Sequence, residues 1–407
     1  MTNAQQPSIQ HLLQTLCPDG VEYATLGEVC KTSMGEFVRK DKQNPNGKYP
    51  VYNGGSTNTG YYDDYNTEAN KVIISARGAG AGFINKIDTP FWAGNSCYVL
   101  SVIDTEKLNW VYLYYALKNQ ENSIINSQQK GGGVPAVSKK QVESLPIPLP
   151  PLPIQERIVE ILDKFSRLSA ELEAELELRK KQYDFYRNRL LSFDSNSDTN
   201  TTEHYHKGYY PLLVKYQTLG EIGTMTKGNG IQKSNFQAEG YPCIHYGQVH
   251  TCYGTFTYKT KSFISEDLAQ KCKKAHTGDL IIATTSEDVE ACCKSTAWLG
   301  EGDVAVSGDA HIFSHNQNPK YIAYLFQTEM FRQQKKKVAT GTKVIRVSGD
   351  SILRFTFPLP PLPVQERIVG ILDKFETLVS DLSQGLPAEI NLVQKQYEYY
   401  RNQLLTF

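Results

Sequence analysis

The sequence predicts an α+β fold in which two globular parts alternate with two long helices. Three observations lead to this prediction. Residues 148–193 recur with few changes as residues 358–407. Both copies carry apolar residues at alternating steps of three and four, the pattern of a helix that packs along a coiled-coil seam. The segments before the copies hold short β-branched and aromatic runs of the kind that form strands, at 49–52, 71–75, 97–102, 248–258, 280–284 and 310–314.

Each long helix should begin just after the repeated run PLPPLP, because proline lacks a backbone donor and restricts the residue before it. The second copy is four residues longer, and the extra residues fall around Gly385, Leu386 and Pro387. Pro387 suits a first helical position, so a kink or a restart is predicted at 385–387. Such a helix could be an oligomerisation tail. Two copies in one chain favour an intramolecular antiparallel coiled coil, since each apolar stripe meets the other at high effective concentration.

A shorter repeat indicates the order of the domains. VEYATLGEV at 21–29 is answered by VKYQTLGEI at 214–222, so the chain is a tandem of two units, each a globular part followed by a long helix. A late helix is predicted in each globular part, over 110–118 and over 321–333. The predicted division is a short N-terminal helix and the first globular part in 1–147, a long helix in 148–193, a polar linker in 194–212, the second globular part in 213–357, and the second long helix in 358–407.

The composition is that of an ordinary globular protein, with 43 basic and 43 acidic residues. Residues 20–147 hold 13 basic and 12 acidic side chains, and residues 213–357 hold 17 and 13. A polyanion would therefore meet local basic clusters rather than a global field. No apolar run approaches the roughly 18 residues of a membrane span, and the N-terminus lacks the basic start of a signal peptide. These features predict a cytoplasmic protein without membrane contact.

The eight cysteines are scattered, and without an export signal they do not indicate a disulfide framework. Cys243, His245, His250 and Cys252 could nominally hold zinc, but their spacing matches no zinc module. Strand residues that flank a hairpin are the favoured interpretation, and no metal site is predicted.

Two motifs suggest catalysis and are set aside. Residues 72–82 run from a strand into a glycine-rich loop, but they lack the following helix and the acidic residue of a dinucleotide site. The sequence Asn-Pro-Lys-Tyr at 318–321 resembles the motif by which amino-methyltransferases hold an exocyclic amine, although an Asn N-cap with Pro in the first turn is the simpler account. The chain has no phosphate-binding loop, no HExxH and no carboxylate–lysine set. No catalytic residue is predicted.

What remains is a polar, tyrosine-rich loop surface whose side chains could bond phosphates and base edges, the alternative being an ordinary solvated surface. Lys130, the run Lys335 to Lys337, and Lys343 are predicted to touch DNA backbone beside glycine-containing loops. The DNA-binding candidates in the first globular part are Asn53, Ser56, Asn58, Lys71, Arg77, Gln128, Gln129 and Lys130. Those in the second are Lys227, Asn229, His245, Gln248, Thr284, Thr285, Lys335, Lys336, Lys337, Lys343 and Arg346.

The whole chain resembles the specificity subunit of type I restriction–modification systems. The resemblance rests on four features: CPDGVEY at 17–23, the paired QERIVxILDKF at 155–165 and 365–375, the paired KQY at 181–183 and 395–397, and the two RN-(R/Q)-LL-(S/T)-F ends. Order and duplication both match the family. The resemblance does not imply the target sequence itself. Because the two globular parts differ greatly, an asymmetric bipartite site rather than a palindrome is expected.

The resemblance implies a non-catalytic subunit. Each globular part would be a target-recognition domain that reads one half of an asymmetric bipartite site in double-stranded DNA. The helices would fix the spacer and dock two methyltransferase subunits, which use S-adenosylmethionine to methylate adenine N6. Restriction/translocase subunits would use ATP and magnesium, and this chain would bind no cofactor. The rival classes are a self-contained methyltransferase–nuclease, against which the absent motifs count, and a scaffold that binds only protein.

Overall fold

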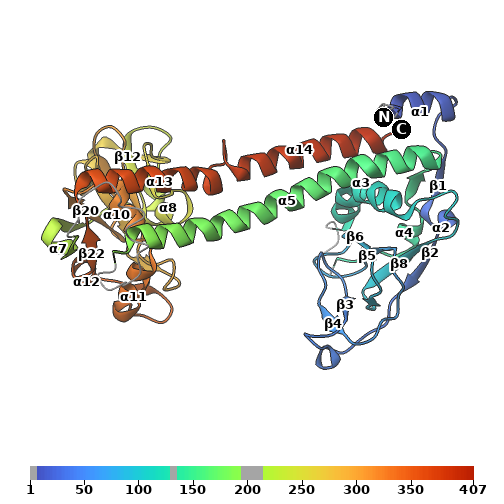
Figure 1. Ribbon diagram of the computed structural model, residues 1–407, viewed down its shortest axis with the longest axis horizontal. Coiled ribbons are helices and arrows are strands. Elements are labelled where there is room, and N and C mark those ends of the chain that lie inside the picture. The colour runs from blue at the N-terminus through green and yellow to red at the C-terminus, as the bar shows by residue number, and fades with distance from the viewer. Residues whose placement is uncertain (1–6, 129–134, 194–213) are drawn as a thin grey trace, which may run out of the picture. The chain divides into compact units, whose positions relative to one another are not determined.

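The computed structural model describes residues 7–128, 135–193 and 214–407. The chain forms two compact units, one of residues 1–174 with 389–407 and one of residues 175–388. Each unit therefore joins one globular part to helical segments from both copies of the long repeat (Figure 1). The predicted α+β fold with a repeated architecture is confirmed.

The first copy of the long repeat is a single helix, α5 (Leu152–Leu191), of 40 residues, or about 60 Å at the usual rise per residue. The second copy is two helices, α13 (Leu362–Ser380) and α14 (Leu386–Leu405). Both long helices begin inside the proline run, at Leu152 and Leu362, two residues before the predicted first helical residue. Pro153 and Pro363 are tolerated because the first-turn N–H groups of a helix have no intrahelical partner.

A short turn separates α13 from α14. The Asp381 carboxylate accepts hydrogen bonds from the N–H and the hydroxyl of Ser383, at 2.7 and 2.6 Å. A Cβ on Gly385 would collide with the backbone oxygens of Thr377 and Leu378, so glycine is required there. Pro387 then lies in the first turn of α14.

The first unit is built on a four-stranded antiparallel sheet, in the order β2-β8-β5-β6. A three-stranded sheet, β4-β3-β7, and the antiparallel pair β1-β9 complete it. Its elements before α5 are α1 (Ile9–Leu16), β1 (Tyr23–Thr25), α2 (Leu26–Val29), β2 (Cys30–Met34), η1 (Lys40–Lys42), β3 (Tyr49–Tyr52), β4 (Gly60–Tyr62), β5 (Lys71–Ser75), β6 (Ile84–Ile87), β7 (Trp92–Ala93), β8 (Cys97–Val102), α3 (Trp110–Gln128), α4 (Lys139–Glu143) and β9 (Pro146–Pro148).

The second unit has a five-stranded sheet, β11-β20-β16-β18-β13, a four-stranded sheet, β14-β12-β19-β15, and the pairs β17-β21 and β10-β22. Its elements before α13 are β10 (Lys215–Thr218), α7 (Leu219–Ile222), β11 (Gly223–Lys227), η2 (Lys233–Asn235), β12 (Tyr241–Ile244), α8 (Tyr246–Thr251), β13 (Phe256–Thr257), β14 (Ser262–Ile264), α9 (Glu266–Ala269), β15 (Lys274–Ala275), β16 (Leu280–Ala283), β17 (Thr285–Ser286), β18 (Lys294–Trp298), β19 (Val304–Val306), β20 (Ala310–His315), α10 (Pro319–Leu325), α11 (Glu329–Val338), β21 (Ile345–Arg346), α12 (Gly349–Leu353) and β22 (Thr356–Leu359).

Two local predictions are wrong. Residues 248–258, predicted as a strand, begin inside the helix α8, because His245 caps its N-terminus and accepts a hydrogen bond from the Gly247 N–H at 3.1 Å. The helix predicted over 321–333 is split into α10 and α11, because the Thr328 hydroxyl accepts from the Phe331 N–H and starts a new helix. The equivalent helix of the first unit, α3, continues without a break to Gln128.

Aromatic stacking pairs the long helices within each unit. In the first unit, Phe165 of α5 stacks on Tyr400 of α14 with 5.4 Å between ring centroids, and Ile158 shares a core with Leu405. The earlier residue of α5 lies with the later residue of α14, so the two helices run antiparallel. In the second unit, Tyr186 of α5 stacks on Phe375 of α13 at 5.6 Å. These are the contacts that the repeated apolar seam predicts.

A tyrosine near the start of each globular part hydrogen-bonds the residue at the end of a long repeat. The Tyr216 hydroxyl donates to the carbonyl of Phe193 at 2.9 Å, and the Tyr23 hydroxyl donates to that of Phe407 at 3.4 Å. The two contacts are repeat equivalents. Among the described residues, no helix is both long enough and apolar enough to cross a membrane.

Candidate nucleic-acid interface

Three glycine-bearing loops of the first unit meet beyond the end of β5. Ser75, the last residue of that strand, accepts a hydrogen bond from the Gly55 N–H at 2.8 Å and donates to the Gly55 carbonyl at 3.1 Å. The Ala76 N–H donates to the Ser96 carbonyl at 2.7 Å. A Cβ on Gly94 would collide with the Asn53 side chain. The backbones of these loops are thus packed against one another.

This surface gathers only some of the candidates of the first globular part. Ser56 and Arg77 are exposed on it, whereas the Asn53 Oδ1 is buried and has no hydrogen-bond partner among the described residues. Lys71 begins β5, so it lies at the opposite end of that strand from Arg77. Asn58 follows in the same loop as Ser56 and is half-buried. The side chain of Gln128 and the whole of Gln129 and Lys130 lie outside the described residues.

The corresponding end of the main sheet in the second unit carries a cavity of about 510 Å³. It brings together four sequence-predicted residues from three separate segments, Lys227, Thr284, Thr285 and Arg346. Sequence reasoning missed the other polar residues that line it, Asp309, His311, Thr340, Ser348 and Asp350. The signal that could have found Ser348 and Asp350 is the dipeptide Val347-Ser348, which repeats Val137-Ser138 of the first globular part and which Asp350 follows closely.

Hydrogen bonding orders the inner wall of this cavity. Thr284 is buried, and its hydroxyl lies 3.0 Å from the Nδ1 of His311. Burial, and then the nearby charge of Lys227, lower the pKa of His311. The imidazole is therefore neutral at pH 7 and can both donate and accept hydrogen bonds.

Each unit has an arginine in the same backbone β-bridge. Arg77 is on the earlier of the two paired segments in the first unit, and Arg346 is on the later one in the second. The Val137 N–H donates to the Ala76 carbonyl at 2.9 Å, and the Val347 N–H donates to the Thr284 carbonyl at 3.2 Å, which makes these two pairs equivalent. The next pair outward is Arg77 with Ala136 in the first unit and Thr285 with Arg346 in the second. Both arginines are exposed, and neither guanidinium has an ion-pair or hydrogen-bond partner in the part of the chain that the structure describes.

Three further candidates of the second globular part use their side chains in hydrogen bonds within the fold. Asn229 accepts from the Lys273 N–H at 2.6 Å and donates to the Lys271 carbonyl at 2.9 Å. Gln248 accepts from the His245 N–H at 3.1 Å and donates to a serine hydroxyl at 2.7 Å. His245 is buried as the N-cap of α8, and burial lowers its pKa.

Lys335 requires a correction. Its side chain is 3% exposed, and its Nζ donates to the carbonyls of Glu290 and Cys292 at 2.8 and 2.9 Å. Burial lowers its pKa. A contact with DNA backbone is incompatible with this placement, because the run of three lysines lies on a helix and only one face of a helix meets solvent. Lys336 forms an ion pair with Glu290 at 3.4 Å, while Lys337 and Lys343 are exposed.

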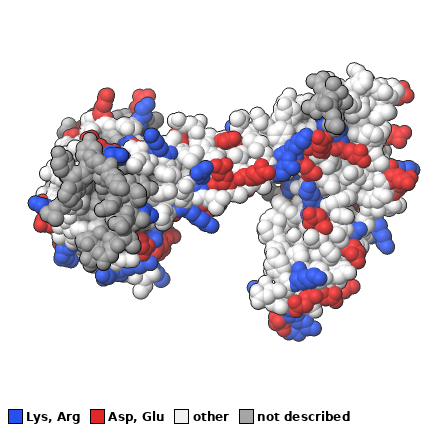
Figure 2. Space-filling model, viewed as in Figure 1, with Lys and Arg blue, Asp and Glu red and all other residues white. Residues whose placement is uncertain are grey.

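Charge is mixed over the face of the molecule in Figure 2, where small basic groups alternate with acidic ones. No group of three or more His, Cys, Asp or Glu side chains that could hold a metal ion occurs within residues 7–128, 135–193 and 214–407.

Comparison with known proteins identifies the class. The family model "Type I restriction modification DNA specificity domain" matches residues 18–178 and again residues 211–392. The chain therefore belongs to the family of type I restriction–modification specificity subunits. It is a DNA-recognition subunit rather than an enzyme, and the resemblance seen in the sequence is confirmed.

Individual relatives agree in length and order. The chain is 31% identical over 406 residues to the EcoR124I/EcoR124II specificity subunit of Escherichia coli, covering 95% of this chain and 94% of that protein. It is 29% identical over 403 residues to a putative type I specificity subunit of Haemophilus influenzae, covering 95% and 96%. The fold is similar to the crystal structure of a type I S subunit from M. genitalium, with a TM-score of 0.60, 18% identity and coverage of 95% and 96%.

Proposed function

We propose that this chain directs a type I complex to an asymmetric bipartite DNA site, with each globular part reading one half. The observation that carries the proposal is the equivalent pair of exposed arginines, Arg77 and Arg346, set among otherwise different loops. A common backbone arrangement that carries different loop side chains suits the reading of two unlike half-sites. Arginine commonly reads guanine through two hydrogen bonds in the major groove.

The helices are proposed to set the spacer between the half-sites and to dock two methyltransferase subunits. Support for two equivalent docking sites comes from apolar side chains that the helices leave exposed at repeat-equivalent positions. Leu178 is 66% exposed and its equivalent Leu392 is 57% exposed. Phe185 is 57% exposed and its equivalent Tyr399 is 60% exposed. Large exposed apolar side chains in matching pairs are typical of a surface that a partner covers.

The chemistry is assigned to the partners. Methyltransferase subunits would use S-adenosylmethionine to methylate adenine N6, and restriction/translocase subunits would use ATP and Mg²⁺. In this proposal the chain described here holds none of these cofactors. Its own residues contribute position and sequence choice only.

The test is to express the chain with the methyltransferase subunit of its system in a host without adenine methylation, and to map the methylated adenines. We expect one split motif with unlike halves and a fixed spacer. The purified chain alone should transfer no methyl group from S-adenosylmethionine to DNA. Methyl transfer by the isolated chain, or a continuous palindromic motif, would contradict the proposal.

The lysine run offers a matched pair of variants that separates folding from DNA contact. Lys335→Met should leave two buried carbonyl oxygens unpaired and lower the free energy of unfolding by about 1–3 kcal/mol. Lys337→Met should leave stability unchanged, and if it removes a phosphate contact it lowers the salt slope of DNA binding by about 1. Denaturant unfolding and a salt titration of DNA affinity measure the two effects. A normal stability of Lys335→Met with a reduced salt slope would contradict this assignment.

A further inference from the structure

Two fully buried glutamines join the globular parts to the long helices. In the first unit, Gln155 of α5 accepts from the Asn109 N–H at 2.9 Å and donates to the carbonyls of Lys107 and Pro150 at 2.8 and 2.7 Å. Asn109 also caps α3, because its Oδ1 accepts from the Val111 N–H at 2.8 Å. Gln155 thus ties the start of α3 to the first turns of α5.

The second unit repeats this arrangement. Gln365 of α13 accepts from the Asn318 N–H at 3.0 Å and donates to the Gln317 side chain and the Pro360 carbonyl, both at 2.8 Å. Asn318 is the N-cap of α10. Both glutamines have no exposed surface, and each side chain uses its acceptor and both of its donor hydrogens.

A tyrosine further along α3, and another further along α10, makes a second connection to the long helix of the same unit. Tyr115 of α3 donates to Asp163 of α5 at 2.6 Å. Tyr324 of α10 contacts Asp373 and Glu376 of α13, both at 2.7 Å. Burial, and then the neighbouring carboxylates, raise the pKa of Tyr324 well above its ordinary range. The hydroxyl therefore stays protonated and donates to a charged acceptor, which gives strong and directional bonds.

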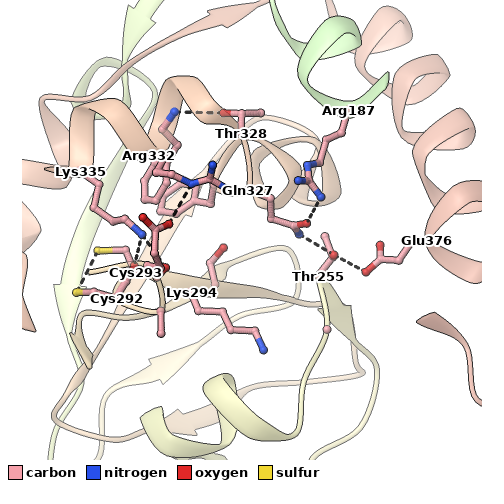
Figure 3. A pocket seen from close by; sticks show the side chains of 16 residues that line it. Arg187, Thr255, Cys292, Cys293, Lys294, Gln327, Thr328, Arg332, Lys335 and Glu376 are labelled. Carbon is pink, nitrogen blue, oxygen red and sulfur yellow. Dashed lines mark hydrogen bonds and ion pairs between the residues drawn. The ribbon is translucent and has the colours of Figure 1, made fainter. Parts of the chain in front are cut away.

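In the second unit the connection continues to α5, along the cavity of Figure 3. Arg187, which is 8% exposed, donates to Gln327 at 3.2 Å. Gln327 donates to the Thr255 hydroxyl at 2.8 Å, and Thr255 donates to Glu376 of α13 (Figure 3). The globular part thereby holds α5 and α13 together. In the first unit Arg401 of α14, the repeat equivalent of Arg187, donates to Asn119 of α3 at 3.3 Å.

We propose that these bonds form a positioning network that fixes the angle of each recognition domain on its helices, and so restricts the complex to one spacer length. The positioning network consists of Gln155, Tyr115, Asp163 and Arg401 in the first unit and Gln365, Tyr324, Asp373, Glu376, Gln327, Thr255 and Arg187 in the second. The proposal rests on the proposed function. Apolar contacts are non-directional and permit small rotations, whereas the partly buried hydrogen bonds from the tyrosines to the carboxylates are directional and restrict them.

The repetition argues against a role in stability alone. The loops that would read DNA differ between the units, as Arg77 and Thr285 show at equivalent positions. The part of the network that both units share keeps the same residue types at the same helical steps: Gln, then Asp eight residues later, with Tyr opposite. Two domains that must present unlike surfaces at one fixed distance need a common attachment, not common loops.

Tyr324→Phe and Tyr115→Phe test this, because each removes only a hydroxyl from a buried ring. In complex with the methyltransferase subunit, each variant should keep both half-site sequences. Methylation at sites whose spacer is one base pair longer or shorter should rise about tenfold, the factor associated with one hydrogen bond to a charged group. The double variant should show a greater increase than either single one. Mapping of methylated adenines measures the half-sites and the spacer in one experiment.

Tyr321→Phe is the matched control, since that hydroxyl is equally buried but donates to the Pro358 carbonyl, at 2.9 Å, within the globular part. It should lower the thermal midpoint as Tyr324→Phe does and leave the spacer unchanged. If Tyr324→Phe does not fold, Asp373→Asn, which keeps an acceptor without the charge, should relax the spacer by a smaller factor. A fixed spacer in the tyrosine variants overturns this inference alone. The absence of any split motif with the unmodified chain overturns the proposed function, and the inference with it.

Discussion

A second copy of the tetrapeptide Ser169-Ala-Glu-Leu172, inserted after Leu172 in α5, should lengthen the spacer of the methylated site by one or two base pairs and leave both half-sites unchanged. Four residues add about 6 Å of helical rise. They complete slightly more than one turn, so the apolar seam stays roughly in phase. B-DNA advances about 3.4 Å per base pair, which sets the size of the change.

The place of the insertion makes this outcome physically reasonable. The boundary between the two compact units crosses α5 after Ala174. The stacked pairs Phe165 with Tyr400 and Tyr186 with Phe375 lie on either side of it, each inside its own unit. An insertion after Leu172 therefore leaves almost all packing within each unit intact, which is why a whole turn of helix should be tolerated.

Two further insertions serve as controls. The same tetrapeptide placed in residues 194–213, outside the long helix, should leave the spacer unchanged. Two residues inserted after Leu172 rotate the following helix by about 200°, move the seam to the wrong face and should abolish methylation. Methylation that persists at the original spacing in the four-residue variant, or that moves to other half-sites, would rule out the role of α5 as a ruler.

Replacement of Arg77 or Arg346 by alanine should relax one position in one half-site and leave the other half unchanged. A bidentate contact from arginine to guanine is worth about 1–3 kcal/mol of discrimination against the wrong base. Its loss should therefore raise methylation at sites with another base there by roughly tenfold or more relative to the original site. Arg77→Ala should act on the half-site of the first unit and Arg346→Ala on that of the second.

Comparing the methylated sequence motifs of these variants with that of the unmodified chain distinguishes a base contact from a phosphate contact. Arg354→Ala is the matched control, because this arginine of the second globular part is also exposed but donates to the Ser351 hydroxyl at 3.2 Å. It should leave the motif intact. If Arg346→Ala weakens methylation equally at all sequences and lowers the salt slope of binding, the side chain contacts phosphate and the assignment to a base is wrong.

The repeated sequence predicts the long helices and the break between α13 and α14 because each of these features is determined by residues close together in the chain. The seam of α5 and the glycine–proline step at Gly385 act over a few residues, so the sequence contains what determines them. The helix α8 was missed because its N-cap is a histidine, an uncommon cap whose ring takes the place that Ser, Thr, Asp or Asn usually fill.

The recognition surface depends on contacts between distant segments, and the sequence gives little sign of them. The charge of Lys335 suggested a surface residue, but its ammonium lies buried against carbonyls of Glu290 and Cys292, more than forty positions away. The equivalence of Arg77 and Arg346 is likewise invisible in an alignment of the two repeats, because the arginines come from opposite strands of the same bridge. Only the pairing of the strands places them together.

The contact of Tyr23 with Phe407 is equivalent to that of Tyr216 with Phe193, so each long repeat packs its end against the globular part of the other half of the chain. In each unit a globular part therefore contacts the last residue of a long repeat that follows the other globular part. A shorter gene that encodes one globular part with one long repeat would thus supply both kinds of surface. Two such molecules could complete each other as a symmetric dimer, which would present the same half-site reader twice and so favour an inverted-repeat target.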